Sequence, residues 1–231
     1  MGRFAEDTAE KYQFTRQAQD AFAQESLGRA KQAVEQGAFR DEIVPVRLAK
    51  GEAVADEPVM RADPAKIPLL KPAFRDGGTV TAANASGISD GAAALVLMSA
   101  SEAERRNVQP LARILGHATH AQAPAWFTTA PVGAIEKLLQ KIGWKKGETD
   151  LFEINEAFAV VALAVMRELN LSHEKVNVNG GACALGHPIG ASGARILVTL
   201  LHALRQRGLK RGIASLCIGG GEATAIAVEL L

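Results

Sequence analysis

The sequence has only two cysteines, Cys183 and Cys217, among its 231 residues. Two cysteines do not make a disulfide scaffold or a zinc site built from thiolates. No apolar run approaches the ~18 residues that a membrane-spanning helix needs, and residues 1–7 lack the apolar stretch of a secretory signal. We therefore expect a reduced, cytoplasmic protein that holds no metal ion and does not bind a membrane.

Net charge is also nearly absent, at +1. A balanced charge gives no indication of a nucleic acid or an anionic membrane as partner. Hydrophobic residues make up 48% of the chain and charged residues 22%, which is typical of a globular protein. The length is sufficient for one large domain or two smaller ones.

The first half of the sequence predicts a helix followed by an irregular stretch. Apolar residues at helical spacing predict a helix over 15–36, which Thr15 caps and Gly37 ends. Residues 43–46 predict a short edge strand, because a proline within them removes a ladder donor. Four prolines between residues 50 and 76 interrupt any regular element, so we expect a surface excursion there.

Residues 95–99 predict a strand, and Ser101 with Glu104 forms a capping box for a short helix to Arg106. From about residue 111, predicted strands alternate with helices. The strands are expected at 111–117, 151–154, 176–178, 213–218 and 224–230, and the helices at 131–143, 157–169 and 193–207. This order predicts a layered α/β domain, in which ligands gather at the ends of the strands.

His187 stands among five glycines that fall between Gly180 and Gly193. Glycine lets the backbone approach a ligand closely, or adopt a positive φ. A rigid histidine in such a place can transfer a proton or hold a developing oxyanion, although it can also merely hydrogen-bond a turn. The glycine spacing matches neither the dinucleotide fingerprint nor the phosphate loop of nucleotide hydrolases.

Three further residues combine a reactive group with a strand end or a turn. Cys217 precedes three glycines whose N–H groups can cradle an oxyanion, but it can equally be a small buried hydrophobe. Asn155 follows a buried strand, where it can either cap a helix or orient a water. Ser86 is either a turn residue or a hydroxyl contact to a ligand. Cys183 is expected to fill the core.

Three motifs together resemble the thiolase family of acetyl-CoA acetyltransferases and 3-ketoacyl-CoA thiolases. They are residues 155–158 (Asn-Glu-Ala-Phe), 186–193 (Gly-His-Pro-Ile-Gly-Ala-Ser-Gly) and 217–221 (Cys-Ile-Gly-Gly-Gly), and the likeness extends over essentially the whole chain. The resemblance implies a thiolase-like layered α/β fold. It implies a loop domain at residues 1–88 that covers coenzyme A, a remnant of the N-terminal domain at 89–108, and a complete C-terminal domain at 109–231.

The resemblance also implies catalytic roles. His187 would hold the thioester oxygen and help to activate the nucleophile. Cys217 would take a proton from the α-carbon of acetyl-CoA and return it. Asn155 would fix a water that forms one oxyanion hole with His187, and the N–H of Gly219 would contribute to a second. An asparagine and a cysteine at these positions favour a thiolase over the related ketoacyl synthases.

Coenzyme A and acetyl-CoA would be substrates, with no permanently bound cofactor. By the same resemblance Ser86 would contact the pantetheine arm, Phe74, Ala82 and Phe158 would form its apolar walls, and Arg61 would contact the nucleotide end. The family forms dimers and tetramers, so a homo-oligomer is expected.

In the family the cysteine that carries the acyl group lies in the N-terminal half, which this sequence does not include. We therefore expect the chain to be inactive by itself in acyl transfer through a covalent intermediate. The alternatives are a non-catalytic module that binds coenzyme A, one half of a split thiolase whose nucleophile comes from another chain, and a gene fragment with no independent role.

Overall fold

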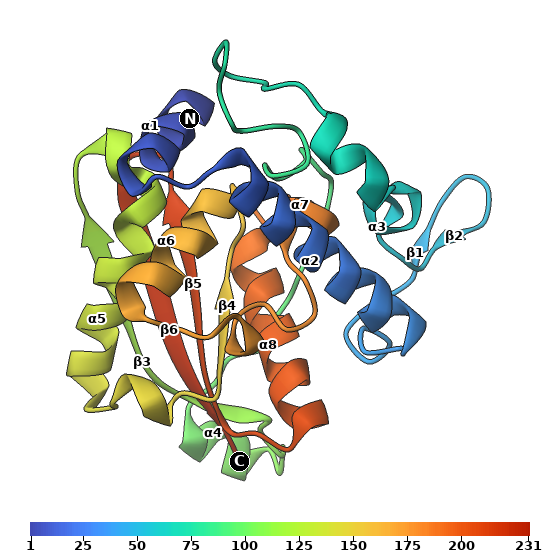
Figure 1. Cartoon of the computed structure of the whole chain (residues 1–231). Helices are drawn as coiled ribbons and strands as arrows, with labels where there is room; N and C mark the ends of the chain where they lie inside the picture. The colour runs from blue at the N-terminus through green and yellow to red at the C-terminus, as the bar shows by residue number, and fades with distance from the viewer.

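The computed structural model describes every residue from Met1 to Leu231. A mixed four-stranded sheet with the order β3-β6-β5-β4 forms its centre (Figure 1). The strands are β3 (Ala112–Ala121), β4 (Leu151–Ile154), β5 (Arg211–Ile218) and β6 (Glu222–Leu230). β4 runs parallel to β5, whereas the other two pairings are antiparallel. The carboxyl ends of β4 and β5 therefore lie at the same edge of the sheet.

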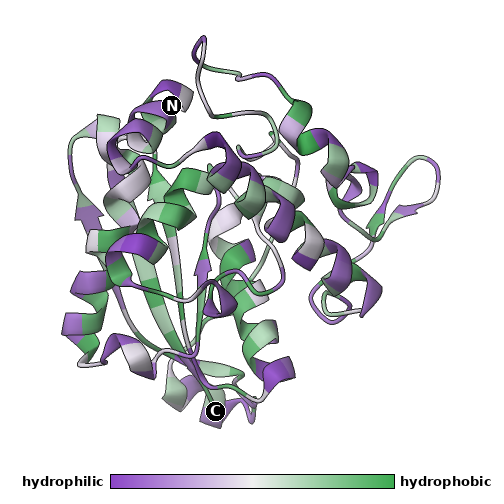
Figure 2. Ribbon diagram, in the orientation of Figure 1, coloured by the Kyte–Doolittle hydropathy of each residue, from purple (hydrophilic) through white to green (hydrophobic).

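Helices cover both faces of this sheet. α5 (Ala130–Ile142) and α6 (Ala159–Leu169) lie on one face, and α8 (Ser192–Arg207) lies on the other (Figure 1). Successive residues of a strand point to opposite faces, so Ile213 packs into the core under α5 and α6, whereas Ala214 packs against α8. Figure 2 shows apolar residues concentrated on the strands and on the inner helices.

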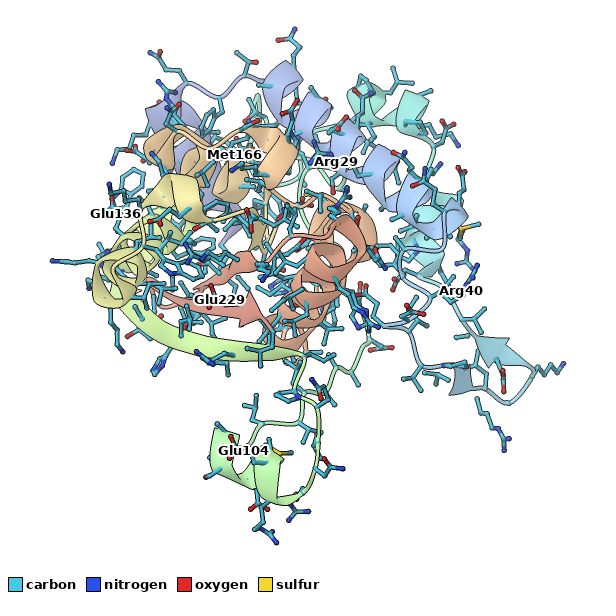
Figure 3. All side chains as sticks on the ribbon, turned by 90° about the horizontal axis from the view of Figure 1, so that it is seen from below. Arg29, Arg40, Glu104, Glu136, Met166 and Glu229 are labelled. Atoms are coloured by element: carbon cyan, nitrogen blue, oxygen red, sulfur yellow. The ribbon has the colours of Figure 1, made fainter.

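Residues before β3 form helices and loops that pack against one end of the sheet or project from it. They are α1 (Gly2–Tyr12), α2 (Arg16–Glu35), α3 (Glu57–Arg61), α4 (Ala100–Arg105), the hairpin of β1 (Val46–Arg47) with β2 (Glu52–Ala53), and a 3₁₀ helix (Pro64–Leu69). The later minor elements are α7 (Ala182–Leu185) and 3₁₀ turns at Pro124–Thr129, Lys146–Glu148 and His173–Lys175. Figure 3 shows α4, with Glu104, and the hairpin standing away from the body. No helix of the chain has both the length and the apolar character that crossing a membrane requires.

Most of the predicted regular elements are confirmed. α2 begins after Thr15, whose hydroxyl accepts a hydrogen bond from the N–H of Ala18 at 3.1 Å. Gly143, at φ 72°, ends α5, and Gly208, at φ 64°, ends α8. The predicted strand at 151–154 is β4, and all four of its residues are buried.

The prediction of a strand at 95–99 is wrong. Residues 88–98 make no backbone hydrogen bond, and the side chain of Val96 is 86% exposed. A strand is stabilised by the neighbour to which it is hydrogen-bonded, and none lies beside this stretch. The helix that follows is capped by Ser99, which accepts from the N–H of Glu102 at 3.2 Å, rather than by Ser101.

Three other predictions need correction. Residues 50–76 are not without regular structure, because Pro58 and Pro64 lie in the first turns of α3 and of a 3₁₀ helix, where a missing N–H is tolerated. The edge strand is confined to two residues, Val46 and Arg47. Residues 176–178 form no strand, because Asn177 turns the chain with φ 50°.

Candidate active site

Asn155 leaves β4 at the carboxyl edge of the sheet. Its N–H donates to the carbonyl of Ser215 on β5 at 3.0 Å, so the parallel ladder continues for one residue beyond the strand. The side chain is fully buried. The residue that caps α6 is Phe158, which removes the helix-capping interpretation of Asn155. Its amide points instead to His187, with Nδ2 3.4 Å from Nε2 of the ring.

The backbone around His187 is fixed by a close approach to residues 87–89. Gly186 has φ 89°, and a Cβ added there would lie 2.0 Å from the hydroxyl oxygen of Ser89, so only glycine fits. The N–H of His187 donates to the carbonyl of Gly87 at 3.0 Å. The loop is thus held at both of these residues, and the ring is presented from a rigid support.

Two contacts fit the tautomer of the His187 ring that carries its proton on Nδ1. The hydroxyl of Ser192 donates to the carbonyl of Pro188 at 3.1 Å and therefore accepts from Nδ1–H of the ring at 2.5 Å. Nε2 is then the acceptor that faces the amide of Asn155. Burial lowers the pKa of His187 and the positive charge of Arg195 lowers it further, so the ring is neutral at neutral pH.

Cys217 lies one residue before the end of β5, where it pairs with Ala223 of β6. It is 7% exposed, and burial raises its pKa to about 12, so the group is a thiol at neutral pH. Because Asn155 continues β4 beside Ser215, the thiol and the amide leave adjacent parallel strands at the same edge. The N–H of Gly219 makes no hydrogen bond within the chain and is a free donor in the turn that follows.

Residues 84–87 connect these parts. The N–H and the hydroxyl of Ser86 both donate to the carbonyl of Ala157 at 3.1 Å, and the N–H of Ala159 donates to the carbonyl of Asn84 at 2.8 Å. Gly87, the next residue, holds His187. The segment with Ser86 is therefore attached to two of the three sequence motifs.

The residues predicted to contact coenzyme A are brought together only in part. The rings of Phe74 and Phe158 meet edge to face, with their centres 6.0 Å apart. Ala82 is exposed, two residues before the buried Asn84. Arg61 lies on α3 with its side chain 77% exposed, and its ion pair is with Glu57 at 3.3 Å. No hydrogen bond joins Ala82 or Arg61 to His187 or Asn155.

A groove of about 420 Å³ lies beside the histidine loop, between residues 89–93 and 188–191. No three histidine, cysteine or acidic side chains lie close enough to hold a metal ion. The sequence pattern alone does not indicate that Ser192 is the partner of the ring. The available signal was its place in the same motif, five residues after His187, at the start of α8.

This chain is similar to known proteins over its whole length. The family description "Thiolase, N-terminal domain" matches residues 1–101, and "Thiolase, C-terminal domain" matches residues 108–230. The chain is 51% identical to a probable acetyl-CoA acetyltransferase of Dictyostelium discoideum, over 100% of its own length and 57% of the relative's. It is 52% identical to the acetyl-CoA acetyltransferase of Chromobacterium violaceum, over 99% of its length and 60% of the relative's.

Solved structures of thiolases and acetyl-CoA acetyltransferases superpose closely on this chain. The Bacillus anthracis acetyl-CoA acetyltransferase superposes with a TM-score of 0.95 at 50% identity, covering 100% of this chain and 60% of that protein. The Acat5 thiolase of Ascaris suum, in complex with coenzyme A, gives a TM-score of 0.91 at 44% identity, with the same coverage of 100% and 60%. This chain therefore spans about 60% of the length of the relatives it matches. The layered α/β fold predicted from the sequence is confirmed, and the chain belongs to the thiolase family.

Proposed function

We propose that this chain carries the proton-transfer machinery of a thiolase, the acyltransferase that interconverts acyl-CoA plus acetyl-CoA with 3-ketoacyl-CoA plus coenzyme A. The observation that carries the proposal is the contact between the amide of Asn155 and Nε2 of His187, at the sheet edge where Cys217 lies one residue before the end of β5. The acetyl-CoA acetyltransferases among its relatives support the same reaction class.

The geometry fits the formation of an enolate. Claisen chemistry needs an acid/base group at the α-carbon and donors at the oxygen on which charge develops. Nε2 of neutral His187 can take a proton from an attacking thiol and, once protonated, donate to the thioester oxygen. The amide oxygen Oδ1 of Asn155 is buried without a hydrogen-bond partner, which suits the ordered water expected there. The free N–H of Gly219 provides the second donor.

Cys217 is suited to proton transfer at carbon. As a thiol it gives its proton to the carbanion of the departing acetyl-CoA when a 3-ketoacyl-CoA is cleaved. The thiolate left behind is a strong base, because the pKa of Cys217 is raised to about 12. In the reverse direction the thiol first loses its proton to water, which gives a small thiolate fraction at neutral pH, and this thiolate removes a proton from the methyl group of acetyl-CoA, which restores the thiol.

We propose further that the chain by itself does not carry acyl groups covalently. Its one other thiol, Cys183, donates to the carbonyl of Glu156 at 3.8 Å. Burial and the nearby Glu156 carboxylate raise the pKa of Cys183 well above its usual value, which is the reverse of what a nucleophilic cysteine needs. Covalent acyl transfer then requires a cysteine that lies outside residues 1–231.

Deuterium exchange tests the proton-transfer step without needing that nucleophile. The chain is incubated with acetyl-CoA in D₂O, and deuterium in the methyl group is followed by NMR. We expect exchange above the buffer rate, no thiolysis of acetoacetyl-CoA, and a loss of roughly 10²–10³-fold in exchange for His187→Ala. Cys217→Ala should abolish exchange, whereas His117→Ala, at an exposed position on β3, is the matched control.

Saturable binding of coenzyme A by the folded chain without exchange would contradict this function and favour a binding module. We also propose that the chain works as a homo-oligomer in a reducing compartment, where both of its cysteines remain free thiols. Sedimentation analysis tests the oligomeric state. The division at residues 88 and 108 remains a prediction, which limited proteolysis can test.

A further inference from the structure

Glu156 is a fully buried acidic residue that the proposed chemistry does not use. It directly follows Asn155, at the end of β4. Burying a carboxylate is unfavourable unless hydrogen bonds compensate for the lost water. The contacts of this carboxylate therefore indicate which parts of the fold depend on it.

The carboxylate accepts three hydrogen bonds from three different segments. Oε1 accepts from Nδ2 of Asn177 at 2.7 Å. Oε2 accepts from the hydroxyl of Ser26 on α2 at 2.7 Å and from the N–H of Cys183 at 3.0 Å. Cys183 is in the first turn of α7, the short helix that ends directly before Gly186 and His187.

Two of these partners bind the same region again. The hydroxyl of Ser26 accepts from the N–H of Gly181 at 3.0 Å. Asn177 binds the last residue of β4 through both atoms of its amide, with Oδ1 2.8 Å from the N–H of Ile154 and Nδ2 2.8 Å from its carbonyl oxygen. Glu156 therefore joins the end of β4 to the start of α7.

The backbone of Gly180 and Gly181 is packed so closely against Glu156 and α2 that no side chain fits at either position. A Cβ on Gly181 would lie 2.3 Å from the carboxyl carbon of Glu156, and a Cβ on Gly180 would lie 2.5 Å from the carbonyl oxygen of Ser26. α2 lies against α7 in Figure 1. Arg29, labelled on α2 in Figure 3, adds a hydrogen bond of 2.8 Å from its guanidinium to the carbonyl of Val176.

We propose that Glu156 is a positioning residue that holds α7 against the end of β4 and thereby sets the distance between Nε2 of His187 and the amide of Asn155. The inference rests on the proposed function, because it assigns a role within that same site. Glu156 also connects α2 to residues 186–188 through Ser26 and α7. The same carboxylate therefore holds both α2, which precedes the predicted coenzyme A contacts, and the loop that carries His187.

Glu156→Gln tests the proposal, because it keeps the shape but turns one accepting oxygen into an NH₂ group that faces other donors. The maximal rate of methyl deuterium exchange should fall about 10- to 100-fold, the cost of a misplaced catalytic group, while the dissociation constant for coenzyme A stays within about threefold. Amide hydrogen exchange at residues 183–187 should speed up, and the NMR signals of the His187 ring should move. Glu42→Gln is the control, because the half-buried carboxylate of Glu42 hydrogen-bonds only Thr199, at 3.2 Å.

A folded Glu156→Gln protein with the wild-type exchange rate, His187 signals and amide protection would overturn the proposal. If this variant does not fold, Ser26→Ala decides in its place. It removes the donor to Oε2 of Glu156 and the acceptor of the Gly181 N–H, and should give the same changes at a smaller size. Unchanged His187 signals would contradict the role. If the wild-type chain exchanges no methyl deuterium, the proposed function fails, but the ring signals and amide protection still decide whether Glu156 positions the loop.

Discussion

Replacing Asn155 with aspartate reverses the polarity of the contact with His187. In the wild type an amide N–H faces Nε2 at 3.4 Å, and the pKa of the ring lies below its ordinary value of 6.5. In Asn155→Asp a carboxylate faces the ring at the same distance. Two opposite charges about 3.4 Å apart attract by roughly 5 kcal/mol at an effective dielectric constant of about 20, which sets an upper limit of ~3–4 pKa units. We expect a rise of about 1–3 units, the usual effect of an opposite charge in contact.

NMR titration of ring-labelled histidine between about pH 5 and about pH 9 measures this shift. The chain has five histidines, and His187→Gln identifies the signal. The midpoint should move from below the ordinary value to above it, and methyl exchange at neutral pH should fall because the new carboxylate repels the negative charge that develops on the thioester oxygen. Asn155→Ala is the control, since it removes the amide without adding charge and should leave the pKa of His187 low. An unchanged or lowered midpoint in Asn155→Asp would refute the placement of the two side chains.

Three further predictions concern stability. Burial raises the pKa of Glu153 to about 8, so its protonated form contributes stability that is complete below about pH 4.5 and is lost as the pH rises through about 8. The unfolding free energy of Glu153→Gln should therefore increase relative to that of the wild type over this pH range, by at most a few kcal/mol. A difference in urea unfolding between the two proteins that does not vary with pH would contradict this. Gly186→Ala should cost about 1–3 kcal/mol and slow methyl exchange, because φ is 89° and the Cβ has no space, whereas Gly190→Ala, with open space around it, should change neither. Phe152→Ala should lower the free energy of unfolding by about 3–5 kcal/mol, because Phe152 is 1% exposed in the core. Calorimetry should show a much smaller loss of stability for Phe74→Ala, because Phe74 is 39% exposed.

Local signals in the sequence were sufficient for the elements whose ends are marked by side chains or glycines. Thr15 begins α2, and Gly143 and Gly208 end α5 and α8 in the left-handed conformation that glycine favours. The buried strand β4 could be predicted because its apolar run is short and is followed by polar residues. His187 and Asn155 could be singled out because each interrupts an apolar or glycine-rich context with a group that can do chemistry.

Features that depend on distant partners could not be predicted. Residues 95–99 have the composition of a strand, but their conformation depends on a neighbour that local sequence does not specify. The hydrogen bond between Ser26 and Glu156 joins residues 130 positions apart, and no periodic pattern indicates it. The valines on either side of Asn177 predict an extended segment, whereas Asn177 makes a left-handed turn with φ 50°. In each case tertiary contacts outweigh local preference.

The central claim is that the ring of His187, the amide of Asn155 and the thiol of Cys217 act on one thioester. A crystal structure of this chain with acetyl-CoA tests it most directly. We predict the thioester oxygen within hydrogen-bond distance of Nε2 of His187, and the methyl carbon within about 3.5 Å of the sulfur of Cys217. A thioester bound elsewhere, or a methyl group separated from that sulfur by other side chains, would contradict the account.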